Sequence, residues 1–332
     1  MLLMEKKRVK YKTDFGMKNT SALTGTIMVF LLFSILSDDF LTVYNISNVL
    51  KNCAVLLIAS MGTTMAILLG SNDISVGSVM SLGGIITAML IKGGADPALA
   101  AAAGLAAGLG AGLINGILIV YFQANFWVAT FAMYSIAQGI ALILSDGNGI
   151  AGFPGGFRFL GTGKVFGVYF IILLAAALLA LMYVLLNKTR FGGYIYAIGE
   201  SERIAGITGI PTGKVKLLVF TLSGLCAGTA GILLAAKTNV AMPSGGAGYE
   251  FDAIAAVIIG GTSLDGGKGS VLGTAVGVFL ITVIRNGLTV MGLSSVFHYL
   301  VIGLIIMAVI VVDVLQIQLR ENRKESDARE CK

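Results

Sequence analysis

The chain has 332 residues, of which 56% are hydrophobic and 12% are charged, and its mean hydropathy is +0.91. Soluble domains carry about 25% charged residues, so this composition excludes a soluble protein and predicts an integral membrane protein. The formal net charge of +6 does not indicate nucleic acid binding, because the basic residues gather before residue 20, between Lys188 and Lys216, and after Val314.

The three basic regions predict the orientation of the chain in the membrane. Basic loops stay on the cytoplasmic side, so we expect both termini and the segment 188–216 in the cytoplasm, with an even number of crossings. The segment 1–19 is a basic cytoplasmic start, and 316–332 is a charged cytoplasmic tail. After the first apolar run, Leu36 stands where a secretory signal needs a small residue, so this run is predicted to remain as a helix.

The apolar runs predict an all-α polytopic membrane protein with one transmembrane domain, residues 20–315. A membrane-spanning helix needs about 20 apolar residues. The candidate spans are 20–37, 48–69, 74–91, 97–122, 126–145, 165–187, 215–236, 251–264, 270–290 and 295–315. Segment 251–264 is short and flanked by glycines, which is typical of a half-helix or a re-entrant element that lines a cavity.

Asp73 lies between two hydrophobic runs with no basic residue nearby. An ionisable group at membrane depth is a candidate functional residue, so Asn72, Asp73 and Ser75 are predicted to form part of a substrate path. Asn72 or Asp73 could also be the N-cap of a helix that begins near Ile74. The two interpretations are compatible, because a capped and broken helix is one way to build a polar site inside a membrane.

The candidate span 126–145 has the only tryptophan of the chain near its start, among neutral hydrogen-bonding groups. An uncharged sugar is matched by aromatic faces and by amide or hydroxyl partners, so this run is predicted to line a sugar path. A tryptophan at the membrane interface beside helix–helix hydrogen bonds explains the same pattern equally well. The residues concerned are Asn125, Phe126, Trp127, Thr130, Tyr134 and Gln138.

The polar segment 188–216 contains a stretch, 196–207, with helix signals at both ends. Carboxylates near its start suit a helix N-terminus, and the glycines and the proline that follow supply a stop. A helix this short is marginal in water unless something packs on it, so we expect it to dock on a partner protein. The residues predicted to make this contact are Gly199, Glu200, Ser201, Glu202, Arg203, Ile204 and Ala205.

Tyr249, Glu250 and Asp252 stand at the start of the short span. They predict either an entrance that receives an extracytoplasmic partner or a simple charge pair at a helix start. Residues 266–270 lack the spacing of a phosphate-binding loop, so ATP hydrolysis is expected on a separate chain. The single histidine, His298, and the three cysteines have no metal-like spacing, so neither a metal site nor a catalytic group nor a cofactor is expected.

Three blocks resemble the ribose-type permease subunits of bacterial ATP-binding-cassette (ABC) sugar importers, which are branched, binding-protein-dependent transport permeases. The blocks are Asn72–Ser78, Tyr196–Glu200 and Tyr249–Ser263, the last continuing to Gly273. The resemblance covers most of residues 45–315 and implies a type II ABC importer-like fold of about ten helices. It also implies a second permease subunit, identical or related, two ATPase subunits and an extracytoplasmic sugar-binding protein.

In that family, the segment Gly199–Ile207 would be the helix that couples the permease to its ATPase, and the regions of Asp73 and Thr130 would line the translocation path. The chain departs from the family pattern around Asn125–Thr130, where many members have Pro-Phe-Ile-Val-Thr. It also departs at Gln138, where many have arginine, and at Ser71-Asn72, where Gly-Ile is commoner. These departures bear on the identity of the substrate more than on transport.

We therefore expect a multi-pass permease of the bacterial inner membrane that imports a monosaccharide or a sugar-like solute by ATP-driven alternating access. The sequence does not select among ribose, another monosaccharide and a sugar-like signal such as autoinducer-2. Two other hypotheses remain. One is an ion-coupled secondary transporter that uses carboxylates at Asp73, Glu250 or Asp252, and the other is a non-transporting membrane scaffold.

Overall fold

The computed structural model describes residues 17–294, 297–298, 300–305, 307 and 311. The predicted tail 316–332 lies outside the described residues, as do most of the segment 1–19 and about half of the last predicted span, 295–315. The helices are α1 (Met17–Leu36), α2 (Val43–Leu68), α3 (Val76–Lys92), α4 (Pro97–Val120), α5 (Phe126–Leu144), α6 (Gly155–Thr162), α7 (Phe170–Lys188), α8 (Arg190–Glu200), α9 (Glu202–Ile207), α10 (Thr212–Thr238), α11 (Tyr249–Ile259) and α12 (Val271–Val290). The strands are β1 (Ile150–Ala151), β2 (Lys164–Val165), β3 (Val168–Tyr169) and β4 (Val240–Ala241).

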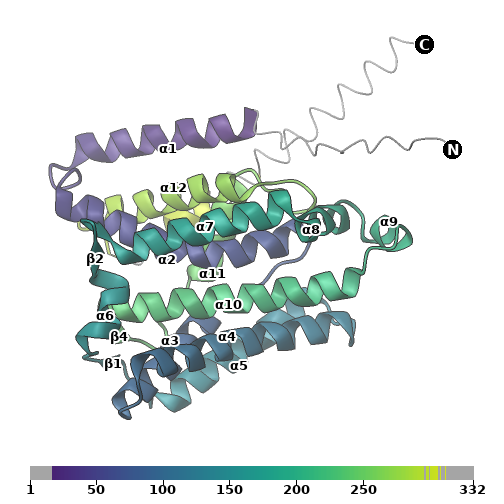
Figure 1. Ribbon diagram of the computed structural model, residues 1–332. Helices are drawn as coiled ribbons and strands as arrows, with labels where there is room; N and C mark the ends of the chain where they lie inside the picture. Colours follow the sequence, from purple (N-terminus) through teal and green to yellow (C-terminus); the bar gives the residue numbers. More distant parts are fainter. Residues whose placement is uncertain (1–16, 295–296, 299, 306, 308–310, 312–332) are drawn as a thin grey trace, which may run out of the picture.

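The long helices lie side by side with their axes roughly aligned (Figure 1). The strands and α6 gather at one end of this bundle, which we call the hairpin end, and α8 and α9 lie at the other, which we call the α9 end (Figure 1). Strand β1 pairs with β4, and β2 pairs with β3, both in antiparallel register. Helix α1 starts at the α9 end and α2 returns there, so the break between α2 and α3 lies on the same side of the bundle as α8.

Glycine faces hold the centre of the bundle together. Helix α10 packs against α4 so closely that a Cβ on Gly108 would lie 2.5 Å from the Gly224 carbonyl oxygen, and one on Gly224 would lie 2.2 Å from the Gly108 oxygen. Apolar side chains gain nothing by leaving lipid for one another, so close backbone packing of this kind stabilises helix pairs in membranes. Packing through small faces is what the 45 glycines predict.

Each predicted span up to 270–290 corresponds to a helix, with ends shifted by a few residues. Six described helices are long and apolar enough to cross a membrane, namely α2, α4, α5, α7, α10 and α12. Helix α3 and residues 22–36 of α1 are apolar but shorter, so the count of ten crossings stays a prediction. Helix α11 has 11 residues and follows the irregular segment 242–248, which is the form expected of a half-helix.

The predicted helix 196–207 is not continuous. Ser201 leaves the helical conformation, with φ of −165° and ψ of 106°, and separates α8 from α9. Its hydroxyl accepts a hydrogen bond from the Ile204 backbone N–H at 3.4 Å, which makes it the N-cap of α9. The predicted stop is confirmed, because α9 ends at Ile207 and Gly209 then adopts φ of +84°.

Candidate functional site

The break between α2 and α3 holds the Asp73 carboxylate inside the bundle. Gly70, with φ of +73°, turns the chain after α2, and the Asp73 side chain that follows is 1% exposed. Its Oδ1 accepts hydrogen bonds from the Ser75 backbone N–H at 3.0 Å and from the Ser75 hydroxyl at 2.6 Å. Its Oδ2 accepts a hydrogen bond from the Ser223 hydroxyl of α10 at 2.8 Å. Three donors therefore satisfy this carboxylate.

The same network reaches α4. Asn115 Nδ2 donates to Ser75 Oγ at 3.0 Å, and Asn72 Oδ1 accepts a hydrogen bond from the Asp73 backbone N–H at 2.9 Å. Ser75, rather than Asn72 or Asp73, occupies the N-cap position of α3 and makes no side-chain cap bond. The Asp73 carboxylate nevertheless accepts the Ser75 backbone N–H, so it does satisfy a free amide at the start of this helix, as the capping interpretation expects. Asn115 Oδ1 is buried and accepts no hydrogen bond among the described residues. The polar groups at the break thus join α3, α4 and α10.

The polar residues at the start of α5 that were predicted to line the path make their hydrogen bonds within α5 itself. Asn125 is the N-cap and accepts a hydrogen bond from the Trp127 backbone N–H at 2.9 Å. The buried Thr130 donates to the Phe126 carbonyl at 2.8 Å. The Trp127 side chain is 48% exposed. These contacts agree with either interpretation of the run.

Two further α5 residues make contacts away from this helix start. The Tyr134 ring stacks on Phe131, with centroids 6.3 Å apart. Gln138 reaches another element, because its Nε2 donates to the Pro243 carbonyl at 2.9 Å. No hydrogen bond within the described part of the chain links the α5 path residues to Asp73.

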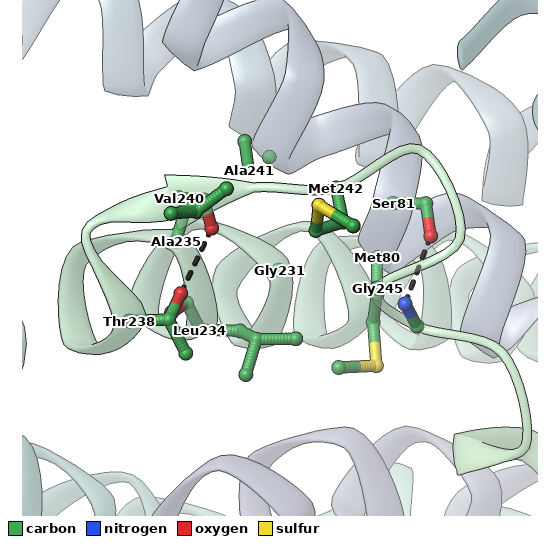
Figure 2. Close-up of a pocket in the computed structure, with 12 residues that line it drawn as sticks. Met80, Ser81, Gly231, Leu234, Ala235, Thr238, Val240, Ala241, Met242 and Gly245 are labelled. Carbon is green, nitrogen blue, oxygen red and sulfur yellow. Dashed lines mark hydrogen bonds between the residues drawn. The ribbon is translucent and has the colours of Figure 1, made fainter. Parts of the chain in front are cut away.

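The segment 242–248 between β4 and α11 is held from several sides. Besides Gln138, Ser81 of α3 accepts a hydrogen bond from the Gly246 backbone N–H at 2.9 Å. The segment covers a cavity of about 160 Å³ that lies between α3 and α10 (Figure 2). The Ser81 and Thr238 hydroxyls mark its two ends, and Met80 and Leu234 lie between them (Figure 2). Glycine, methionine and alanine make up most of the lining, so the cavity is mainly apolar.

The acids at the start of α11 lie inside the bundle. Glu250 is 2% exposed, its Oε1 accepts a hydrogen bond from the Gly248 backbone N–H at 3.1 Å, and its other oxygen lies against Gly77 of α3. Asp252 is 3% exposed and forms an ion pair with Arg285 of α12 at 2.7 Å. Both carboxylates, with Tyr249 beside them, face other helices, so the predicted entrance for an extracytoplasmic partner stays untested.

Helix α9 projects from the bundle at the α9 end (Figure 1). Ile204 is 64% exposed and Ile207 is 79% exposed, although both are apolar. Arg203 is exposed as well, whereas Ala205 is buried at 3% exposure. Glu202 forms an ion pair with Lys216 of α10 at 2.6 Å, which ties α9 to the start of that helix. The result is a short helix with an apolar and basic outer face.

Helix α8 is packed against the end of α2. A Cβ on Gly199 would lie 1.9 Å from the Leu68 carbonyl oxygen, which itself accepts a hydrogen bond from the Gly267 backbone N–H at 2.9 Å. The Tyr196 hydroxyl donates to the Gly269 carbonyl at 3.0 Å, and burial raises the pKa of this tyrosine to about 12, so the donor keeps its proton. Glu200 is exposed beside this contact.

Several of these contacts have no signal in the sequence. Asn115, Ser223 and Ser81 are ordinary small polar residues of apolar helices, and only the packing of those helices brings them to the break and to segment 242–248. Gly199 was predicted as part of a contact surface, but it faces α2 and the 266–270 turn. A glycine with non-glycine neighbours on both sides gives no indication of such a close approach.

Comparison with known proteins places these features in a family context. The family model described as "Branched-chain amino acid transport system / permease component" matches residues 45–310. The ribose import permease protein RbsC of Bacillus subtilis (strain 168) is 38% identical over 94% of this chain and 97% of its own length. RbsC of Escherichia coli (strain K12) is 33% identical over 92% of this chain and 96% of its own. The D-allose transport system permease protein AlsC of Escherichia coli (strain K12) is 34% identical over 86% of this chain and 88% of its own. No solved structure matches the chain.

Proposed function

The chain belongs to the family of branched-chain amino acid transport system permease components, and from this membership we propose that it is the membrane-embedded permease subunit of an ABC sugar importer. Its relatives are named as permeases for ribose, D-allose and L-arabinose. The substrate is then a monosaccharide or a sugar-like solute, and the chain is a multi-pass protein of the bacterial inner membrane. ATP is hydrolysed by separate partner subunits.

The observation that carries the proposal is the arrangement at the α9 end. Helix α9 presents exposed Ile204, Ile207 and Arg203, whereas α8 just before it is packed on the end of α2 through Gly199. An exposed apolar helix face of this kind is suited to a groove on a partner protein. A displacement of α9 by an ATPase subunit would pass through α8 to the end of α2 and the adjoining break at Gly70. We propose that this is the coupling route of alternating access.

The proposed path runs beside the break and along α5. The Asp73 network ties the break to α4 and α10, and Gln138 ties α5 to segment 242–248. A displacement of the end of α2 would therefore also displace the helices that flank the path. In this proposal Asn125, Trp127, Thr130 and Tyr134 offer the sugar its contacts, and Asn72, Asp73 and Ser75 fix the shape of the break. The α9 end is cytoplasmic, and the hairpin end faces the extracytoplasmic binding protein.

The ion-coupled alternative has less support. A proton- or sodium-coupled site needs a carboxylate that is free to change its partners. Asp73 accepts three hydrogen bonds and Asp252 is paired with Arg285, so each already has its partners within the bundle. Glu250 has one carboxylate oxygen without a hydrogen-bond partner among the described residues, and it is the residue on which this alternative depends.

Reconstituted vesicles test the proposal. The chain would be purified with the ATPase, the binding protein and any second permease encoded beside it, and uptake of labelled ribose, allose and arabinose would be measured. We expect uptake that requires ATP on the face of the membrane that carries the ATPase. This uptake should continue when a protonophore collapses the proton gradient. Uptake that proceeds without ATP and stops with the protonophore would support the ion-coupled alternative and contradict the proposal.

A further inference from the structure

Three lysines gather at the hairpin end without a role in the proposed transport cycle. Lys51 of α2 and Lys164 of β2 hold their ammonium nitrogens 4.7 Å and 4.8 Å from the centroid of the Tyr169 ring. Lys237, in the last turn of α10, donates to the side-chain oxygen of Asn52 and is near enough to Lys51 for their charges to repel. We call these three lysines and Tyr169 the lysine cluster.

No carboxylate in the described part of the chain pairs with the lysine cluster. The ion pairs among the described residues are Lys216–Glu202 and Arg285–Asp252, and none of the three clustered lysines has a carboxylate within 4.0 Å. Like charges held together cost more as their surroundings become less polar, and an aromatic ring offers a cation much less than a full negative charge does. An anionic group from outside the chain would relieve this repulsion.

The cluster lies where an apolar helix surface begins. Strands β2 and β3 lead directly into α7, which carries no charged residue before Lys188. Outer side chains of α7 are exposed, with Leu181 at 63% and Val184 at 48%. A helix of this composition faces acyl chains, so its first residues lie level with the lipid headgroups. Tyrosine, as at Tyr169, is enriched at that level, and the fully exposed Phe166 at the β2–β3 turn adds an apolar ring beside it.

We propose that the lysine cluster binds the phosphate of an anionic phospholipid, seated between Lys51 and Lys164 with its acyl chains along α7. The phosphate supplies the missing negative charge, and the apolar side of α7 accommodates the chains. A soluble acidic partner would match the charge but would leave the adjoining apolar surface unused. This site is separate from the transported solute and from the coupling surface at the opposite end.

Native mass spectrometry of the purified full chain tests the site, with phosphatidylglycerol and phosphatidylcholine of identical acyl chains as probes. The natural chain should retain phosphatidylglycerol preferentially. The double variant Lys51→Gln/Lys164→Gln should bind phosphatidylglycerol about thirty-fold more weakly, as expected for the loss of two basic residues from an anionic headgroup. Lys92→Gln removes an exposed lysine at the same end and should change nothing. Lys51→Arg/Lys164→Arg keeps the charge and should keep the lipid.

Three outcomes would overturn the proposal. They are equal retention of the two lipids by the natural chain, unchanged retention of phosphatidylglycerol by the glutamine variant, and full displacement of the lipid by millimolar inorganic phosphate.

A second measurement keeps Lys51 and Lys164 intact. In Trp127→Phe/Phe166→Trp the single tryptophan moves to the β2–β3 turn. Brominated phosphatidylglycerol in vesicles should quench it more strongly than the same fraction of brominated phosphatidylcholine, and equal quenching would contradict the site.

Discussion

Gly199 of α8 lies against the carbonyl oxygen of Leu68, the last residue of α2, with so little space that a Cβ on the glycine would come within 1.9 Å of that oxygen. The Gly267 backbone N–H donates to the same oxygen, so the end of α2 is held between α8 and the 266–270 turn. Two residues after Leu68, the chain turns at Gly70 into the break that carries Asp73. A shift of α8 therefore cannot occur without a shift at the break.

The Gly199–Leu68 contact predicts that Gly199→Ala lowers both stability and coupled uptake. The added methyl group meets backbone atoms that cannot rotate away, and overpacking of this kind costs about 1–3 kcal/mol. Gly193→Ala is the matched control, because it lies in the same helix with nothing within 4 Å of its Cβ position. There the change should be neutral or stabilising by about 0.5–1 kcal/mol. Thermal unfolding in detergent and ATP-driven uptake would measure both, and equal behaviour of the two variants would contradict the close contact.

The exposed face of α9 predicts the contact with the ATPase. Ile204→Ser/Ile207→Ser removes two apolar side chains that are 64% and 79% exposed, and it should weaken binding of the ATPase subunit by about tenfold or more. Insertion in the membrane and thermal stability should stay unchanged, since neither side chain packs on the bundle. Val43→Ser, which alters an 85% exposed side chain at the hairpin end, is the control. Co-purification and calorimetric titration would measure the affinity, and full retention of binding would place the contact elsewhere.

The length of the apolar runs sufficed to predict most helices of the bundle, because each long span must satisfy its own backbone within lipid. The short α11 was also foreseen, since an apolar run of that length cannot cross a bilayer. The break at Ser201 was missed, although serine followed by glutamate is a common helix start. The Asp73 network could not be predicted, because Ser223 is 150 residues from Asp73 and Asn115 is 40 residues from its partner Ser75, and only helix packing brings them together.

The Asp73 network predicts a loss of stability rather than a loss of substrate affinity. Ser223→Ala leaves the Asp73 Oδ2 buried without a donor, which costs about 1–3 kcal/mol. Asp73→Asn should cost less, because its side-chain oxygen can still accept from Ser75 and its amide nitrogen can donate to the Ser223 hydroxyl. The double variant also removes this remaining partner, so the cycle measures the part of the cost that belongs to the pair of residues 73 and 223. Unfolding by denaturant measures the cycle. A raised KM for uptake by well-folded Ser223→Ala would instead show that the network touches the solute.

The hydrogen bond between Gln138 and Pro243 predicts that Gln138 restricts the mobility of segment 242–248. Its amide donates to the Pro243 carbonyl at 2.9 Å, so Gln138→Leu should free this end of the segment while Ser81 still holds Gly246. Loss of this partly buried hydrogen bond, at about 1 kcal/mol, corresponds to roughly fivefold faster amide exchange across residues 242–248.

Gln138→Arg is the informative companion to Gln138→Leu, because arginine can still donate to the Pro243 carbonyl and should keep exchange near the natural rate. Hydrogen–deuterium exchange read by mass spectrometry would resolve the segment, and peptides from α12 would serve as the internal reference. If Gln138→Leu leaves exchange in 242–248 unchanged, the segment is held by its other contacts. Gln138 would then be free to face the solute, as the sequence pattern of α5 first indicated.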